Sequence, residues 1–187
     1  MNYTVNNKIY IFLFLFFFFS CVTEKYENKR VNMTVNESYK SSVKTFIGEL
    51  SKEDYLILKN NIEKELNVVI PEGKKILINY YQKGANCFDL HFDKQTQSMV
   101  MDNSIRLSNK FCSQNNAVGY FVNSRDCFQR DIIAKKNIFI EDSGFFSNVI
   151  FTLKENCRSF FILKPNGMFI KHYGGDYYTE VDKYLKN

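Results

Sequence analysis

The chain has 187 residues, enough for one domain with a substantial core or at most two small ones. Its net charge of +5 is mild, and lysines alternate with acidic residues without a basic block, so we expect no nucleic-acid partner. With two histidines, no CxxC pair and none of the common nucleotide-binding or hydrolase motifs, we expect neither a metal site nor a cofactor.

The N-terminus carries an unbroken apolar run of 11 residues, Ile9 to Phe19. A membrane-spanning helix takes ~20 apolar residues, so the run fits a signal peptide over residues 1–20 better than a membrane anchor. Ser20 and Cys21 follow it and resemble the lipobox of bacterial lipoproteins, whose cysteine is lipidated and becomes the mature N-terminus. We therefore expect export to the bacterial cell envelope and a membrane-lipid anchor on Cys21, with the protein facing the periplasm or the cell surface.

Two alternatives to lipidation stay open. Phe18 and Phe19 depart from the leucine and small residue usual in a lipobox, and an ordinary cleaved signal peptide would leave Cys21 without a role. A eukaryotic secreted protein is the other alternative, because Asn32 and Asn36 would then be glycosylation sequons.

Residues 21–42 are polar and without periodicity, which predicts a flexible tether to a domain over residues 43–187. Ser51 and Asp54 resemble a capping box and indicate the start of a helix. The apolar residues that follow recur at helical spacing on a surface helix: Tyr55, Leu58, Ile62 and Leu66.

Three apolar runs in the middle of the chain predict strands. Lys75–Gln82 is nearly continuous, as expected of a strand covered on both faces, and Ala117–Val122 and Asn137–Ile140 are shorter. A helix capped by one of residues 102–104, burying Ile105 and Phe111, is expected between the first two strands. A second helix, capped by Ser124 and sharing one apolar face, is expected between the last two: Phe128, Ile132 and Ile133.

The last third of the chain predicts a hairpin and a terminal helix. Arg158–Lys164 and Met168–Tyr173 are apolar strands joined by a Pro-Asn-Gly turn. Asp176 caps a helix that places three apolar residues on one side: Val181, Tyr184 and Leu185. This order of elements predicts an α/β fold, a mixed sheet with helices on both faces.

The same order, with a cysteine just after the first central strand, resembles the thioredoxin-like fold. The phrase "FFILKPNGMFIKHYGG" (Phe160 to Gly175) is similar to the hairpin of the redoxin group of exported, often lipid-anchored, thiol-disulfide proteins. "IFIEDSGFFSNVI" (Ile138 to Ile150) resembles the segment before that hairpin. The likeness covers roughly Lys75 to Leu185 and implies a thioredoxin-like mixed sheet.

The sequence departs from this family at the residues that carry its redox chemistry. In its Trp-Cys-x-x-Cys motif, Asn86 stands for the Trp, Cys87 for the first cysteine and Leu90 for the second. The family's cis-proline position is Arg158, with Cys157 beside it. Without a neighbouring thiol, a mixed disulfide on Cys87 cannot be released by the ordinary dithiol cycle.

Cys87 nevertheless has a physical case for reactivity. A helix that begins just after it would lower the pKa of its thiol through the helix dipole, and a protonated His91 one turn on would act the same way. The alternative is a buried structural cysteine with a surface histidine.

The resemblance also implies that the loop before the hairpin approaches the first active-site cysteine. We therefore expect a Cys87–Cys157 disulfide, either structural or redox-active, with Cα atoms within ~7 Å of each other. Cys112 and Cys127 are expected to be core or partly exposed thiols, and a bridge between them is a further possible pairing.

The leading hypothesis is a divergent thiol-disulfide oxidoreductase with Cys87 as attacking thiol. Cys157 or a protein thiol partner would resolve the mixed disulfide, and Arg158 would hold a thiolate or an anionic substrate group. The alternative is a non-catalytic binding or scaffold lipoprotein that keeps the fold. A set of acidic residues forms no recognisable carboxylate pair and is expected on the solvated surface: Asp89, Asp93 and Glu141.

Overall fold

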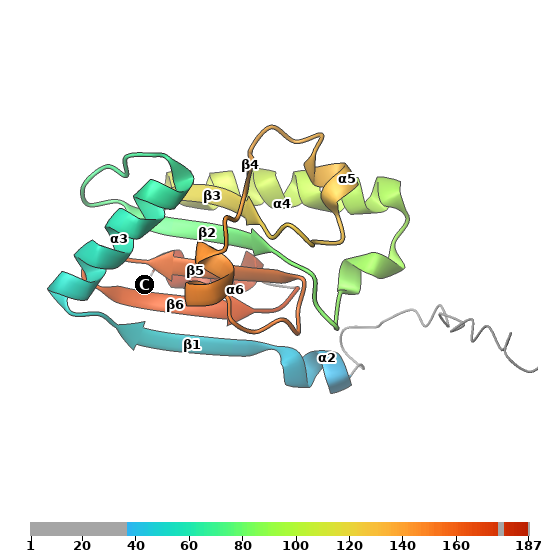
Figure 1. Cartoon of the computed structure of the whole chain (residues 1–187), viewed down its shortest axis with the longest axis horizontal. Coiled ribbons are helices and arrows are strands. Elements are labelled where there is room, and N and C mark those ends of the chain that lie inside the picture. Colours follow the sequence, from blue (N-terminus) through green and yellow to red (C-terminus); the bar gives the residue numbers. More distant parts are fainter. Residues whose placement is uncertain (1–36, 176–177, 187) are drawn as a thin grey trace, which may run out of the picture.

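The computed structural model describes residues 37–175 and 178–186. Six strands in this part of the chain form a mixed sheet (Figure 1). In chain order they are β1 (Lys44–Glu49), β2 (Lys75–Tyr81), β3 (Ala117–Asn123), β4 (Phe139–Glu141), β5 (Arg158–Leu163) and β6 (Met168–Tyr173). The order across the sheet is β1-β6-β5-β2-β3-β4; β2, β3 and β4 are parallel, and the remaining pairs are antiparallel.

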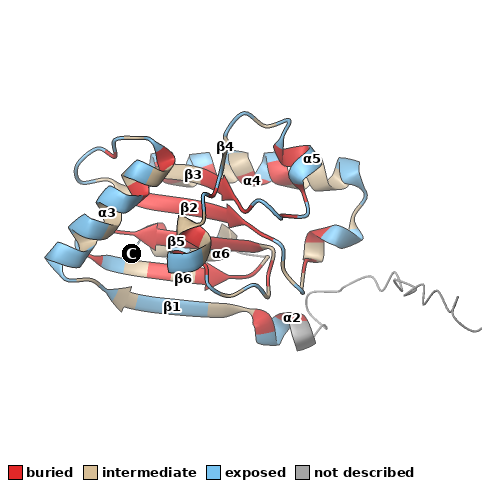
Figure 2. Cartoon of the chain, viewed as in Figure 1, coloured by how far each residue is buried: buried red, intermediate tan, exposed pale blue. Residues whose placement is uncertain are grey.

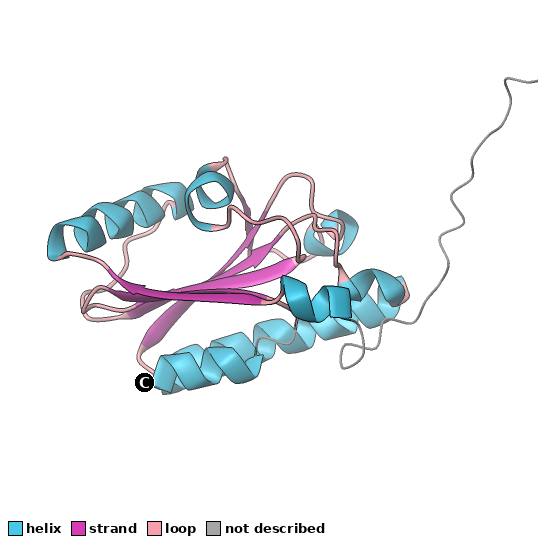
Figure 3. Ribbon diagram, turned by 90° about the horizontal axis from the view of Figure 1, so that it is seen from below, coloured by secondary structure: helices cyan, strands magenta, loops and turns pink. Residues whose placement is uncertain are grey.

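Helices lie on both sides of this sheet (Figure 3). They are α2 (Glu37–Ser42), α3 (Lys52–Leu66), the 3-10 helix η1 (Phe88–His91), α4 (Lys94–Gln114), α5 (Arg130–Ile133), the π-helix η2 (Phe146–Ile150) and α6 (Tyr178–Lys186). One apolar core lies between the sheet and α3 with η2, and two others lie between the sheet and α4, α5 and α6. The predicted α/β class, a mixed sheet with helices on both faces, is confirmed, and it is compatible with a thioredoxin-like fold.

Strand β2 occupies the centre of the sheet, between β3 and β5. Every residue from Ile76 to Tyr81 is buried, as its almost unbroken apolar sequence predicts (Figure 2). Alternate residues enter the cores on opposite faces: Ile76 and Ile78 on the α3 side, and Leu77 on the α4 side. The buried end of β2 therefore fixes where the loop that carries Cys87 begins.

Helix α4 begins earlier than the sequence predicts. Its cap is Asp93, whose carboxylate accepts a hydrogen bond of 2.8 Å from the Thr96 amide, and residues 102–104 lie inside the helix. The apolar periodicity misses the first turns because no residue of this helix before Met101 is buried. The buried stripe comprises Met101, Ser104, Ser108 and Cys112.

The segment after β3 is mostly a turn rather than the predicted helix. Ser124 bonds the Asp126 carboxylate at 2.8 Å and accepts the Cys127 amide with its own carbonyl, and helix forms only over α5. Ile132 is buried as expected, but Phe128 is 44% exposed. The local hydrogen bonds of the Ser–Asp pair compete with helix formation here.

The hairpin of β5 and β6 forms as predicted. Gly167 closes its turn with a φ of +87°, and its carbonyl accepts the Leu50 amide at 2.9 Å. A Cβ at this glycine would lie 2.5 Å from the Leu50 carbonyl oxygen, so the turn requires glycine. Val181 and Leu185 of α6 are buried, also as predicted.

Two N-terminal elements had no signal in the sequence. Residues 37–42, the end of the predicted tether, form α2, and β1 pairs with β6 at the edge of the sheet. Phe46 and Ile47 of this strand are both largely exposed, so no alternation of apolar and polar residues marks it.

Several expectations fall on residues outside the described part of the chain. They are the signal peptide over residues 1–20, lipidation of Cys21, the sequons at Asn32 and Asn36, and the cap at Asp176. Within residues 37–175 and 178–186, no helix combines the length and the apolar character needed to cross a bilayer.

Candidate functional site

Cys87 and Cys157 form a disulfide with their Cα atoms 5.0 Å apart, which confirms the expected pairing. Cys87 lies in the loop between β2 and η1, and Cys157 immediately precedes β5. Because β2 and β5 are antiparallel neighbours, the end of one lies beside the start of the other. Sheet topology therefore brings together two cysteines that are 70 residues apart in the sequence.

Hydrogen bonds to backbone carbonyls hold the two cysteine loops together next to the bridge. The Asn86 amide donates to the Glu155 carbonyl at 2.7 Å, and the buried Gln82 side chain donates to the Asn156 carbonyl at 2.9 Å. Gly84 lies so close that a Cβ there would be 2.6 Å from the Asn156 carbonyl carbon. The two loops are thus positioned by more than the disulfide itself.

Helix α2 contacts the loop that carries Cys157. The Asn156 side-chain amide donates to the Ser42 carbonyl at 2.8 Å, and the Ser42 hydroxyl donates to Asn156 Oδ1 at 3.2 Å. The Tyr39 hydroxyl accepts the Gly175 amide. Tyr39 also lines a small pocket beside Cys157, in which about 10 Å³ is open to the centre of a water-sized molecule, room for about one water.

Arg158 and Asp89 form a buried ion pair at this end of the sheet. Arg158 Nε lies 2.6 Å from Asp89 Oδ2, the two residues are 4% and 6% exposed, and a second guanidinium nitrogen donates to Ser104 at 3.2 Å. Asp89 is therefore not on the solvated surface, contrary to expectation, because η1 turns it inward toward Arg158. The Asp89 carboxylate neutralises the Arg158 charge inside the protein, so the Arg158 side chain helps to hold this end of the sheet together.

The helix dipole does not reach Cys87 as the sequence suggested. Cys87 precedes a single 3-10 turn, and the 21-residue helix α4 begins only at Lys94. The amides at that end face Asp93, where the hydrogen bond from Thr96 lowers the pKa of the carboxyl. His91 is exposed on η1, and Leu90, which stands for the family's second cysteine, is 43% exposed.

The remaining cysteines of the described residues, Cys112 and Cys127, are free and buried. Burial raises the pKa of the Cys112 thiol to about 11 and also raises the pKa of Cys127 above its usual value. Thiols held in the neutral form by an apolar environment are poor nucleophiles. These two cysteines belong to the core.

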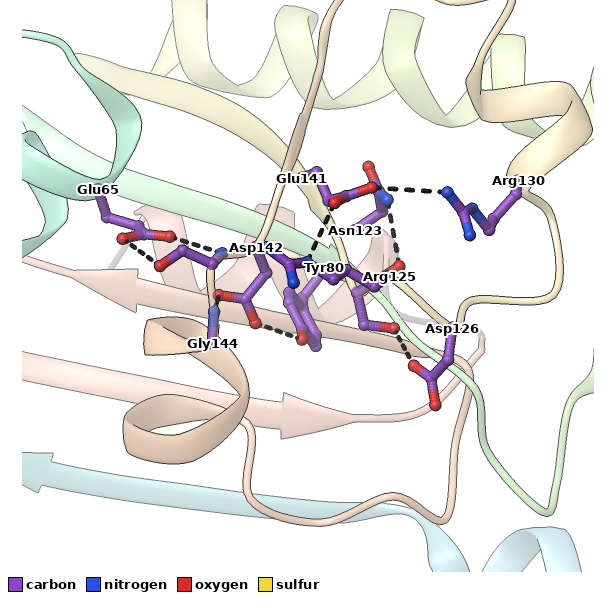
Figure 4. Close-up of polar contacts among 11 residues, drawn as sticks. Glu65, Tyr80, Asn123, Arg125, Asp126, Arg130, Glu141, Asp142 and Gly144 are labelled. Carbon is purple, nitrogen blue, oxygen red and sulfur yellow. Dashed lines mark hydrogen bonds and ion pairs between the residues drawn. The ribbon is translucent and has the colours of Figure 1, made fainter.

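A second polar cluster, which the sequence did not reveal as more than a turn, lies where β2 and β4 end (Figure 4). The buried Asp142 carboxylate accepts the Tyr80 hydroxyl and the Gly144 amide, both at 2.9 Å, and the first amides of η2. Burial would raise the pKa of Asp142, but the hydrogen bonds from Gly144 and Tyr80 outweigh it and hold that pKa below its usual range. This cluster caps η2 and anchors it to β2.

The exposed part of that cluster consists of ion pairs. Glu141 lies 3.2 Å from Arg125 and 3.7 Å from Arg130, with its side chain 48% exposed, so it is on the surface as expected (Figure 4). Surface pairs of this kind contribute little to stability. Across the described ranges, no three His, Cys, Asp or Glu residues gather as a metal site would require.

Comparison of the sequence with protein-family models and with curated proteins gives no match. The family resemblance therefore rests on the element order, the hairpin and the position of Cys87 and Cys157 at neighbouring strand ends.

Proposed function

We propose that this protein is a divergent thiol-disulfide oxidoreductase of redoxin type, with the Cys87–Cys157 bridge as its redox centre. The observation that carries the proposal is the position of this bridge, on two loops at one end of the sheet and beside a small pocket. Its partner would be a protein or peptide that carries a pair of thiols. The partner dithiol would become a disulfide while the bridge becomes two thiols, so two electrons and two protons move together.

We further propose that the domain is exported and held at a bacterial membrane through lipid on Cys21. The apolar run Ile9 to Phe19 followed by Ser20 supports this. Mass spectrometry of the mature N-terminus tests it: acyl chains on Cys21 are expected, whereas an unmodified Cys21 or cleavage beyond it would overturn it.

A non-catalytic binding or scaffold lipoprotein is the second candidate. It is favoured by the 6% exposure of Cys87 and by the 70-residue separation of the bridged cysteines. A bridge that closes a loop of this length stabilises a fold by about 4 kcal/mol in the chain-entropy model. This stabilisation alone would account for the bridge in a non-catalytic protein.

Turnover separates the two candidates. We expect the wild-type protein to oxidise a peptide dithiol or to reduce insulin disulfides, and Cys87→Ser to lose about 100-fold or more of that rate. The matched control is Cys112→Ser, which removes a buried thiol but keeps the bridge. Equal or absent turnover in wild type and Cys87→Ser would favour the scaffold.

A further inference from the structure

We propose that the partner thiol exchanges with Cys157, and that Cys87 is the internal cysteine that leaves when the bridge opens and attacks the mixed disulfide on Cys157 when the bridge forms again. This is the reverse of the order that the family resemblance implies, and it rests on the proposed redox function. The two sulfurs of the bridge differ in what surrounds them, and that difference assigns their roles.

Cys87 is the enclosed sulfur. The residue is 6% exposed, and its Sγ lies 2.9 Å from the Gly84 carbonyl oxygen. In the reduced protein that carbonyl would accept a hydrogen bond from the thiol, which favours the neutral, less nucleophilic form. Gly84 itself packs directly against the Asn156 backbone, which fixes its carbonyl beside Cys87.

Cys157 is the more exposed residue of the bridge. It is partly exposed, and it lines the pocket at the bridge together with Tyr39, Phe88 and Arg158. Cys87 is not among the described residues that line this pocket. A thiolate that enters the pocket therefore reaches Cys157 first.

The exchange then proceeds in two balanced steps. The partner thiolate attacks Cys157 Sγ, a bond forms between these sulfurs, and the Cys87–Cys157 bond breaks with its electron pair going to Cys87. Cys87 takes a proton from water, and the resulting thiol can donate a hydrogen bond to the Gly84 carbonyl. The second partner thiolate attacks the partner's own sulfur in the mixed disulfide, which releases Cys157 as a thiolate.

The residues that line the pocket limit which partner thiols can enter it. Arg158 and Asp89 both line it and neutralise each other at 2.6 Å, and Phe88 adds an aromatic surface. The pocket has room for about one water, so only the tip of a partner side chain can enter it. We expect an extended, unhindered cysteine in the partner and no requirement for a charged neighbour.

Labelling of variants that keep only one cysteine of the bridge tests the assignment. Cys87→Ser leaves Cys157, and Cys157→Ser leaves Cys87; each reduced protein is mixed with glutathione disulfide and the adduct is located by peptide mapping. We expect Cys157 to be modified about tenfold faster or more than Cys87, because access and thiolate character govern the rate. Equal rates, or faster modification of Cys87, would overturn the assignment.

A measurement on the wild-type protein covers the case in which the variants do not fold. The oxidised protein is treated with a limiting amount of reduced glutathione, quenched with acid and mapped. We expect the mixed disulfide on Cys157, with the Cys112 peptide unmodified as an internal control. An adduct on Cys87, or on neither cysteine, would contradict the assignment.

These results are distinguishable from the outcome for the proposed function. Wild-type turnover with an adduct on Cys87 would sustain the oxidoreductase and overturn the order of the sulfurs. No turnover with an adduct on Cys157 would sustain the order and overturn the oxidoreductase.

Discussion

The described cysteines fall into two pairs that differ in chemistry, although one member of each pair is equally buried. Cys87 and Cys112 are each 6% exposed, but Cys87 is bonded to Cys157 and Cys112 is a free thiol. Cys112 lies on the buried stripe of α4, whereas Cys87 lies on a loop at the end of a central strand. Burial alone therefore does not decide the state of a cysteine in this fold; the antiparallel contact of β2 and β5 does.

Removing the bridge is the strongest way to test this contrast. We expect Cys157→Ser to abolish exchange and to lower the free energy of unfolding by about 4 kcal/mol, because the bridge restricts the unfolded chain. The matched Cys112→Ser should keep exchange and lose about 1 kcal/mol, in the usual range for a mild substitution. Denaturant unfolding of the oxidised proteins measures both. Equal losses in the two variants would remove the distinction between the pairs.

The ion pair beside the bridge should have the next largest effect. We expect Asp89→Asn to lower the free energy of unfolding by about 3 kcal/mol, because it leaves the buried Arg158 charge unmatched. The control is Asp131→Asn, which breaks an ion pair with Lys94 of 2.7 Å whose side chains are 72% and 80% exposed. That control should cost less than about 1 kcal/mol. Comparable losses would mean that Arg158 is not held in a desolvated site.

The free thiols of Cys112 and Cys127 should react at alkaline pH and should not exchange with a partner thiol. With a pKa of about 11, roughly one Cys112 thiol in a thousand is ionised at pH 8, so labelling of the native protein should be slow. Its rate should rise about tenfold from pH 8 to pH 9, since the thiolate is the reactive form. Stability linked to this thiol is present below its unfolded pKa and is lost as the pH rises toward 11. Rapid labelling of Cys112 at pH 8 would contradict its place in the core.

The smallest effect is expected at His91. The side chain is exposed on η1, so His91→Ala should change the exchange rate by less than about twofold, as for most surface substitutions. Steady-state turnover at pH 7 measures it. A loss of tenfold or more would restore the role that the sequence suggested for this histidine.

Much of the architecture follows from the sequence because its central elements have strong local signals. The unbroken apolar run of β2, the Pro-Asn-Gly turn at Gly167 and the periodic face of α6 each predict one element. The Cys87–Cys157 pairing could be expected only from the fold resemblance, since nothing in the spacing of two distant cysteines fixes it.

The remaining features depend on contacts between distant residues. The buried stripe of α4 begins only at Met101, so the pattern of apolar residues does not mark the first turns of this helix. Asp89 is buried because Arg158 lies opposite it, 69 residues on, and neither residue alone signals this. Edge strand β1 has two exposed apolar residues in succession and forms through its pairing with β6.

The reduction potential of the Cys87–Cys157 bridge tests the central claim most directly. Oxidised protein is equilibrated with dithiol buffers of graded potential, and the bridged and free forms of the two peptides are quantified. The proposed function predicts reversible reduction of the folded protein at a potential above about −270 mV, in the range of thiol-disulfide oxidoreductases. A bridge that resists reduction to below about −300 mV, as structural disulfides do, would contradict it.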